Sequence, residues 1–227
     1  MNESKRLAGW RSALGLVAIG TALVVGPVTA GSFDDGHDDQ FPTRHRYTKI
    51  GNDGSVLDAA AQLGKGPKDW ACSIDQETGL MWEIKTSDGA LRDKRHTYTP
   101  YDSNPKTNGG WIGYRDSKSG RCDRSQMDEG SCNTEAYLSA VNTAQLCGHS
   151  DWRLPTIPEL VAVAGESSPA AQADVVLPNT AEGWYWTGVS KVGQAVYSRV
   201  ILLPPRGRAS FYDGSYMVRV VRGGAAD

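Results

Sequence analysis

Cysteines, histidines and acidic residues are the side chains of this sequence most able to support chemistry, and their spacing argues against an active site. The four histidines are scattered, and no two of the four cysteines have the Cys-x-x-Cys spacing of common zinc sites. A Gly-x-Ser-x-Gly elbow, a His-Glu-x-x-His helix and a glycine-rich phosphate loop are also missing. We therefore predict that the protein is not an enzyme and has no cofactor or metal centre.

Residues 1–30 have the layout of a cleavable secretory signal. Basic residues precede an apolar stretch, and small residues precede the expected cleavage before Gly31. A retained anchor is the alternative, but residues 12–30 include three glycines and one proline, whereas a span needs about 20 predominantly apolar residues. We expect export to the periplasm or the exterior, with no membrane span after processing. The signal residues are Lys5, Arg6, Arg11, Ala13 to Val25, and Val28 to Ala30.

All four cysteines follow this signal, and an oxidising compartment favours disulfides over free thiols. Four cysteines allow three pairings. Cys122 and Cys132 flank a short segment that contains glycine and aspartate, so we pair them with each other. Cys72 is then expected to pair with Cys147.

Residues 31–46 form an acidic segment that we expect to be a mobile tail. Four aspartates surround His37, and the segment has little apolar content. The Asp-x-Asp-x-Asp-Gly spacing of a calcium loop is missing, so a solvated tail is favoured over a metal site, which the sequence leaves open. Removing the signal changes the net charge from −2 to about −4, which disfavours nucleic acid or an anionic membrane as a partner.

The first strands are expected in a hairpin. Trp70 to Asp75 and Leu80 to Ile84 are apolar runs, and Gly79 between them can adopt a positive φ without steric cost. The preceding residues 47–62 are ambiguous. Val56 to Leu63 is compatible with either a short helix or a strand.

Two helices are predicted. Asn133 or Thr134 can cap the first, which ends near Gly148. In the second, Thr156 and Glu159 have the spacing of a capping box, in which each side chain bonds the other's backbone amide. The buried face of the first helix should comprise Tyr137, Ala140, Val141 and Ala144; in the second helix, Pro158 lies in the first turn and Gly165 ends the helix.

Residues 97–131 lack periodicity and are much longer than an ordinary connection, so they are expected to form an ordered loop fastened by the Cys122–Cys132 disulfide. Its aromatic residues are either a recognition surface or the contacts that pack the loop onto its own domain, and the sequence leaves both open. These residues are Tyr98, Tyr101, Trp111 and Tyr114.

The C-terminal third contains β-rich runs separated by glycine and proline. We expect them to form an antiparallel meander that closes the domain. The runs are Trp184 to Val189, Ala195 to Leu203, Ala209 to Tyr212, and Tyr216 to Val221.

In combination, these motifs resemble the family named for the C-terminal domain of Legionella collagen-like adhesins, the Lcl C-terminal family. The resemblance covers residues 69–223 and is specific although each motif is short. The matching residues are Trp70 to Cys72, Asp75, Thr78 to Glu83, Cys132, Thr134, Glu135, Cys147, Gly148, Asp151 to Thr156, Glu159, Leu160, Trp184 to Trp186, and Val218 to Arg222.

This resemblance implies an α+β, C-type-lectin-like fold of the sulfatase-modifying-factor variety, with two helices, a twisted antiparallel sheet and long irregular loops. It also implies an extracytoplasmic module, and some family members belong to adhesins that recognise sulfated glycans or host surfaces. We expect residues 47–227 to form one such domain, with its core at 69–223. The collagen repeat that trimerises the adhesins is missing from this sequence, so the oligomeric state stays open.

The Asp151-Trp152-Arg153 motif has a structural and a functional interpretation. A buried Trp152 beside a charge-assisted pair of Asp151 and Arg153 would tie the first helix to the second, and we favour this role, together with the Thr156–Glu159 capping box. In the alternative, Arg153 binds a carboxylate or sulfate of a ligand.

The favoured function is a secreted, non-catalytic binding module that recognises glycans or surface proteins in adhesion. Arg206 and Arg208 lie beside two prolines and would display two guanidinium groups on a stiff turn. The alternatives are a structural subunit of an envelope or surface assembly and, less favoured, an enzyme of the formylglycine-generating type. The candidate ligand-binding residues are Trp111, Tyr114, Arg206, Arg208 and Tyr212, with Arg199 and Tyr216 as further candidates.

Overall fold

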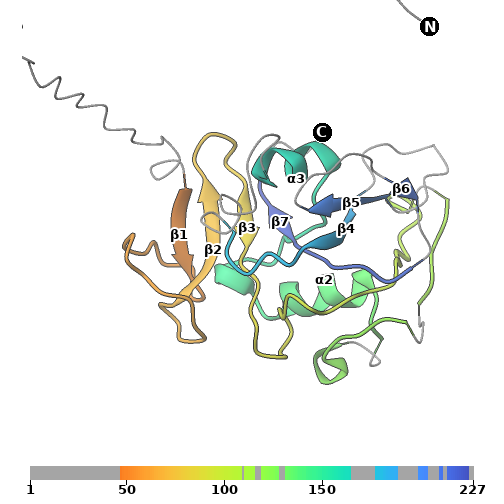
Figure 1. The fold of residues 1–227 in the computed structure, drawn as a ribbon, viewed down its shortest axis with the longest axis horizontal. Helices are drawn as coiled ribbons and strands as arrows, with labels where there is room; N and C mark the ends of the chain where they lie inside the picture. The colour runs from red at the N-terminus through yellow and green to blue at the C-terminus, as the bar shows by residue number, and fades with distance from the viewer. Residues whose placement is uncertain are drawn as a thin grey trace, which may run out of the picture. The chain divides into compact units, whose positions relative to one another are not determined.

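A computed structural model describes residues 47–108, 110–115, 119–127, 131–164, 177–188, 199–203, 210–211 and 214–224. The predicted signal and acidic tail therefore lie outside the described residues. Among the helices that are described, none has the length and apolar character needed to cross a membrane. The described residues have an α+β architecture, as expected, with two α-helices and antiparallel sheets (Figure 1).

The larger sheet contains four antiparallel strands in the order β1-β2-β3-β7. Strands β2 and β3 form the predicted hairpin. Gly79 in its turn has a φ of +69° and donates its backbone amide to the Asp75 carbonyl at 2.8 Å. The strands span Tyr47–Gly51 (β1), Trp70–Asp75 (β2), Met81–Glu83 (β3) and Val221–Arg222 (β7).

A three-stranded antiparallel sheet contains β4 (Gly183–Thr187), β5 (Arg199–Leu203) and β6 (Ser210–Phe211). The meander prediction is correct for these strands but wrong for the last run. Val221 pairs with Trp82 of β3 in the larger sheet, and Met217 forms a parallel bridge to Tyr185.

The reason for this different route is burial on two sides. Val218 and Val220 pack into one hydrophobic cluster, whereas Val221 packs into another, and all three are fully buried. Because neighbouring residues of an extended chain point to opposite sides, this segment needs apolar partners on both of them. The end of a meander offers fewer such partners than a position between two packed clusters.

Two helices contribute to the two hydrophobic clusters on either side of this segment. Helix α2 (Thr134–Thr143) contributes Tyr137 and Val141 to the first cluster, and α3 (Ile157–Ala164) contributes Leu160 and Val163 to the second. Figure 1 shows the two helices on opposite sides of β4, β5 and β7 in that view.

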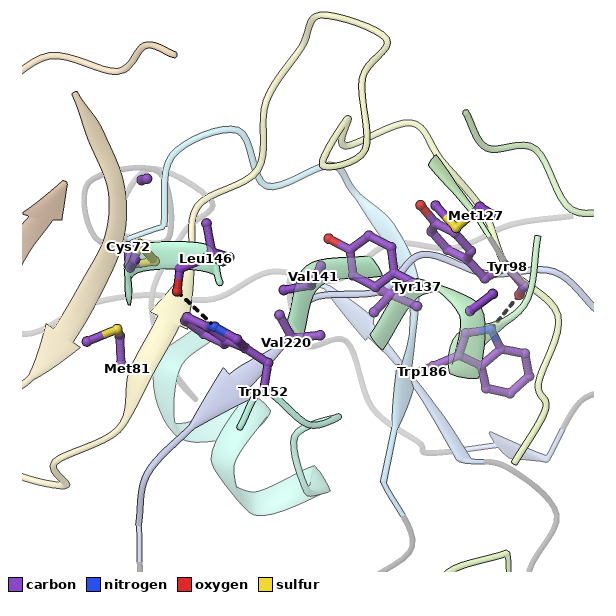
Figure 2. Close-up of a cluster of buried hydrophobic side chains, with 14 of the residues drawn as sticks. Cys72, Met81, Tyr98, Met127, Tyr137, Val141, Leu146, Trp152, Trp186 and Val220 are labelled. Carbon is purple, nitrogen blue, oxygen red and sulfur yellow. Dashed lines mark hydrogen bonds between the residues drawn. A yellow bond between two sulfur atoms is a disulfide. The ribbon is translucent and has the colours of Figure 1, made fainter. Parts of the chain in front are cut away.

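Successive side chains of a strand point to opposite sides, so the large side chains of these strands are divided between the α2 cluster and the α3 cluster. Met81 and Trp186 belong to the α2 cluster, while their chain neighbours Trp82 and Tyr185 belong to the α3 cluster. In the α2 cluster, the Trp186 indole donates to the Tyr98 carbonyl at 2.6 Å (Figure 2). The polar atom of the Trp186 indole is thus satisfied inside the core.

The ends of α2 confirm one prediction and correct another. The Asn133 side chain accepts from the Ala136 amide at 2.8 Å and caps the helix. Ala144 is exposed rather than on the buried face, because the helix ends at Thr143. Gln145 and Cys147 then have φ values of 50° and 51°, in the left-handed region that non-glycine residues seldom adopt, so the helix stops before Gly148.

Both predicted disulfides are present. Cys72–Cys147 joins β2 to the turn after α2 with a Cα–Cα distance of 6.5 Å. Cys122–Cys132 closes the end of the long loop with a Cα–Cα distance of 5.7 Å. The region from Val56 to Leu63 is neither a helix nor a regular strand. Isolated bridges from its two end residues connect it to the sheet, and the Lys49 side chain of β1 donates to the Ala61 carbonyl at 2.7 Å.

Candidate functional site

A cavity of about 460 Å³ lies between residues 101–112 of the long loop and the first turns of α2. Its volume is within the range of small-molecule sites, which is about 300–1,000 Å³. The residues that line it are Tyr101, Asp102, Asn104, Thr107, Asn108, Trp111, Ile112, Thr134, Glu135, Leu138, Arg153, Leu154, Thr187 and Gly188.

The loop wall of the cavity is attached to α2 by side-chain hydrogen bonds. The Thr134 hydroxyl accepts from the Tyr101 amide at 3.0 Å and donates to the Tyr101 carbonyl at 2.8 Å. The Glu135 carboxylate accepts from both the amide and the hydroxyl of Ser103. These contacts fix the irregular loop against a regular helix, so the cavity wall is organised before any ligand arrives.

A tight turn orders the rest of this wall. The Asp102 carboxylate accepts from the Asn104 amide at 2.9 Å and from the Thr107 hydroxyl at 2.7 Å. The Asn108 side chain donates to the Asp102 carbonyl at 3.2 Å and accepts from the Gly110 amide at 2.8 Å. Asp and Asn side chains commonly close such turns by bonding to the nearby backbone.

The walls combine an aromatic and apolar side with polar acceptors. Trp111 is partly buried, and its ring meets that of Tyr114 edge-to-face with centroids 5.6 Å apart. Ile112, Leu138 and Leu154 add apolar surface to the same cavity. An indole beside carboxylates and amides can bind a ligand that has both a hydrophobic face and hydrogen-bonding groups.

Arg153 also lines the cavity, but its guanidinium is already bound. It makes a bidentate pair with Glu159, with N–O distances of 2.6 and 2.9 Å, and donates to the Gly223 carbonyl at 3.2 Å. The Glu159 partner raises the pKa of Arg153 above its ordinary value. This geometry favours the structural interpretation of Arg153 over ligand binding.

The structure also corrects the predicted pairing within the Asp151-Trp152-Arg153 motif. Asp151 does not pair with Arg153 but with Arg222 on β7, at 2.6 and 3.1 Å. Trp152 is buried as expected, and its indole donates to the Leu146 carbonyl at 3.0 Å (Figure 2). Arg153 is held by Glu159 of the α3 capping box and Asp151 by Arg222 of β7, so the two charged side chains that flank Trp152 bind different partners.

The capping box is confirmed. The Thr156 amide donates to the Glu159 carboxylate at 2.7 Å, and the Glu159 amide donates to the Thr156 hydroxyl at 3.4 Å. Glu159 thus serves both the helix end and Arg153, which fixes the direction in which α3 leaves the motif.

A buried ionic network, which sequence reasoning missed, lies on the opposite side of α2 from solvent. Glu83 is fully buried and accepts from Lys85 at 3.0 Å, from the Tyr137 hydroxyl and from the Val220 amide at 3.1 Å. Lys85 also donates to the Tyr137 hydroxyl at 2.7 Å. Arg219, also fully buried, donates to the Glu83 carbonyl at 2.6 Å.

Burial governs the protonation of this network. It lowers the pKa of Lys85 to about 8, although the Glu83 carboxylate acts in the opposite direction, and the nearby Arg219 charge lowers it further. Burial also raises the pKa of Tyr137 well above its ordinary value, and the negative charge of Glu83 raises it further. The network couples β3, α2 and the segment before β7, so we assign it to the scaffold rather than to ligand binding.

A model of the Lcl C-terminal domain matches residues 71–222 of the chain. The chain belongs to the Lcl C-terminal domain family. No curated protein and no solved structure matches the chain significantly. The match confirms the resemblance and places the protein in a family associated with surface adhesins.

Both the buried network and the cavity lie inside the segment that matches the Lcl C-terminal domain. The cavity brings together Trp111, a predicted ligand-binding residue, with Asp102 and Glu135, which were not predicted to bind a ligand. Local sequence patterns around Asp102 and Glu135 did not indicate a binding role. Asp102 and Asn104 precede a proline in a pattern typical of turns, and Glu135 lies in the first turn of a helix, just after its cap.

The other candidate residues divide into two groups. Tyr114 lies beside Trp111 and is 45% exposed, but it does not line the cavity. Arg206, Arg208 and Tyr212 lie outside the described residues, so their relation to the cavity stays a prediction. Of the remaining loop aromatics, Tyr98 is fully buried in the core, which confirms the packing interpretation for that residue.

Proposed function

We propose that the protein is an exported, non-catalytic binding module of the cell envelope or exterior, and that it recognises a glycan in the cavity beside Trp111. The observation that carries this proposal is the cavity itself, with an indole on one side and the acceptors Asp102, Asn108 and Glu135 on others. A sugar ring has an apolar face that stacks on aromatic rings and hydroxyl groups that donate to carboxylates and amides.

The binding fold proposed for this module is C-type-lectin-like. In support, one helix lies on each side of a set of antiparallel strands, and the long loop that the Cys122–Cys132 disulfide closes forms one wall of the cavity. Export is supported by the two disulfides, because such bonds persist in oxidising compartments.

The non-catalytic part of the proposal has its own support. All four cysteines are in disulfides, whereas the chemistry of formylglycine-generating oxidases depends on reactive cysteines. Free-thiol titration of the native protein checks this point, and two reactive thiols would revive the enzymatic alternative.

A glycan array tests the binding function. Wild-type protein, Trp111→Ala and the surface control Val56→Ala would be applied to neutral, amino-substituted, sulfated and uronate-containing glycans, each with and without chelator. We expect wild type and Val56→Ala, whose parent side chain is 73% exposed and outside the cavity, to bind the same glycans. Trp111→Ala should lose this binding about tenfold or more, since stacking on an aromatic ring contributes about 1–3 kcal/mol. If wild type bound none of the glycans, or if Trp111→Ala bound them as well as wild type does, the proposal would be rejected.

A further inference from the structure

A second cavity, of about 560 Å³, adjoins the first. The two share Tyr101 and Glu135 as wall residues. The second cavity extends along the other side of the first turns of α2, where Ala136 and Ser139 line it. A ligand that continues past Tyr101 and Glu135 would therefore pass from one cavity to the other across the start of this helix.

The shared boundary is firmly held. Tyr101 is fastened to Thr134 through both its amide and its carbonyl, and both oxygens of Glu135 accept hydrogen bonds from Ser103. In this region the Asn133 side chain also donates to the Arg115 carbonyl at 2.7 Å. Both cavities are thus built on one fixed element, and their relative position does not depend on a ligand.

The two cavities differ in chemistry. The first contains Trp111 and three aliphatic residues, which suits the apolar face of a sugar ring. The second has a polar wall that includes Arg115, Ser131 and Ser139, which suits hydroxyl groups. A chain of linked sugars offers both surfaces in succession.

The described charges favour an uncharged ligand. In the first cavity, Asp102 and Glu135 are acidic, and the Arg153 guanidinium is held by Glu159. A sulfate or carboxylate placed there would face two carboxylates, with a cation that is already neutralised. The wall of the second cavity includes one residue of each charge, Arg115 and Glu135, so it has no net charge of its own.

We propose that the two cavities form one binding site for a neutral oligosaccharide of at least two sugar residues. One sugar stacks on Trp111, and the next lies beyond Tyr101 and Glu135 and bonds to the polar wall near Ser139. This inference rests on the proposed function and specifies the class and length of the glycan. It differs from a sulfate- or carboxylate-bearing ligand, which the guanidinium groups of Arg206 and Arg208 on their predicted turn would suit.

Oligosaccharide series of increasing length, here called ladders, test the inference. Cello-, manno- and chito-oligosaccharides of one to four residues would be titrated calorimetrically into wild type, Ser139→Trp and Thr143→Trp. Ser139→Trp fills the second cavity, and Thr143→Trp places the same bulky side chain on an exposed position of α2 that lines neither cavity. For wild type and Thr143→Trp, we expect affinity for at least one ladder to rise about tenfold from one to three residues, as added hydrogen bonds allow. Ser139→Trp should lose this rise and keep the affinity for the single sugar.

Three results would overturn the inference: equal affinity for every oligosaccharide length, the same rise of affinity with length in Ser139→Trp as in wild type, or no binding of any neutral oligosaccharide. These outcomes are separate from a failure of the proposed function. If sulfated or uronate-containing glycans bind on the array in a Trp111-dependent manner while the neutral ladders do not, the cavity is a glycan site but the neutral, two-cavity assignment is wrong. If Trp111→Ala binds every glycan as wild type does, the proposed function itself fails.

Discussion

The network around Glu83 and the cavity beside Trp111 both depend on α2, but they use charged side chains in different ways. In the network, Glu83 and Lys85 are almost completely excluded from solvent and are bound by protein groups. At the cavity, Asp102 and Glu135 also hold the chain in place, yet they remain partly exposed on a wall that a ligand can reach. A charged residue in a family motif can therefore be used entirely by the fold, as Glu83 is, whereas Asp102 and Glu135 stabilise the fold and still face a cavity.

Removing each disulfide in turn should give the largest difference in stability between the scaffold and the binding loop. Replacing Cys72 and Cys147 by alanine should lower the free energy of unfolding by about 4.5 kcal/mol, because their long loop constrains the unfolded chain most. Replacing Cys122 and Cys132 should cost about 2.8 kcal/mol and, in addition, weaken glycan binding through the long loop. Urea unfolding and array binding of both variants check this, and equal losses of stability with equal binding would contradict the division into scaffold and binding loop.

The same substitution in each region gives a matched test. Glu83→Gln leaves the Lys85 ammonium buried without its carboxylate partner, and we expect it to lower the free energy of unfolding by about 3 kcal/mol. Glu135→Gln removes a partly exposed carboxylate and should cost less than about 1 kcal/mol. Urea denaturation measures both values. A smaller effect of Glu83→Gln than of Glu135→Gln would show that the buried network does not stabilise the scaffold.

The pH dependence of stability reports on Lys85 specifically. Its pKa of about 8 in the folded protein is below the ordinary value of 10.5, so the unfolded chain binds more protons between these values. The folded state is therefore favoured as the pH rises, and from pH 7 to pH 9.5 this group should add about 2 kcal/mol to stability. We expect wild type to show this gain relative to Lys85→Met in urea unfolding across that range. Parallel pH profiles of the two proteins would exclude a depressed pKa for Lys85.

A smaller effect links the two regions through Arg153. Glu159→Gln keeps a capping side chain but removes the charge that holds the guanidinium, so stability should fall by only about 1 kcal/mol. The released cation at the cavity wall should increase binding of sulfated glycans on the array. Arg153→Met in the same background is the control, and it should abolish the increase. If Glu159→Gln binds sulfated glycans no better than wild type, Arg153 does not influence the cavity.

The parts of the structure that could be predicted from sequence are those fixed by neighbouring residues. The Asn133 cap, the Thr156–Glu159 capping box and the Gly79 turn each depend on contacts within a few positions. The cysteine pairing could also be predicted, because one pair is close in sequence and the other follows by elimination.

The rest depends on distant contacts that local patterns do not encode. Lys85 and Tyr137 are 52 positions apart, and Arg219 bonds to Glu83 across 136 positions. The route of residues 216–222 likewise follows from two separate clusters that need apolar side chains on opposite sides. The cavity was missed for the same reason, since its walls come from a loop, a helix and two other segments that meet only in the folded chain.

The central claim is that the protein binds glycans through the cavity while the buried network only maintains the scaffold. The most direct measurement is calorimetric titration of Trp111→Ala with the glycan that wild type binds best, with urea unfolding of the same sample and of Tyr137→Phe as its counterpart in the network. We predict that Trp111→Ala loses affinity about tenfold or more while its free energy of unfolding falls by no more than about 1.5 kcal/mol, the contribution of its ring contact with Tyr114. Tyr137→Phe should lose about 1–3 kcal/mol of stability with unchanged affinity. Unchanged affinity in Trp111→Ala, or a loss of affinity that is explained by unfolding, would contradict the account.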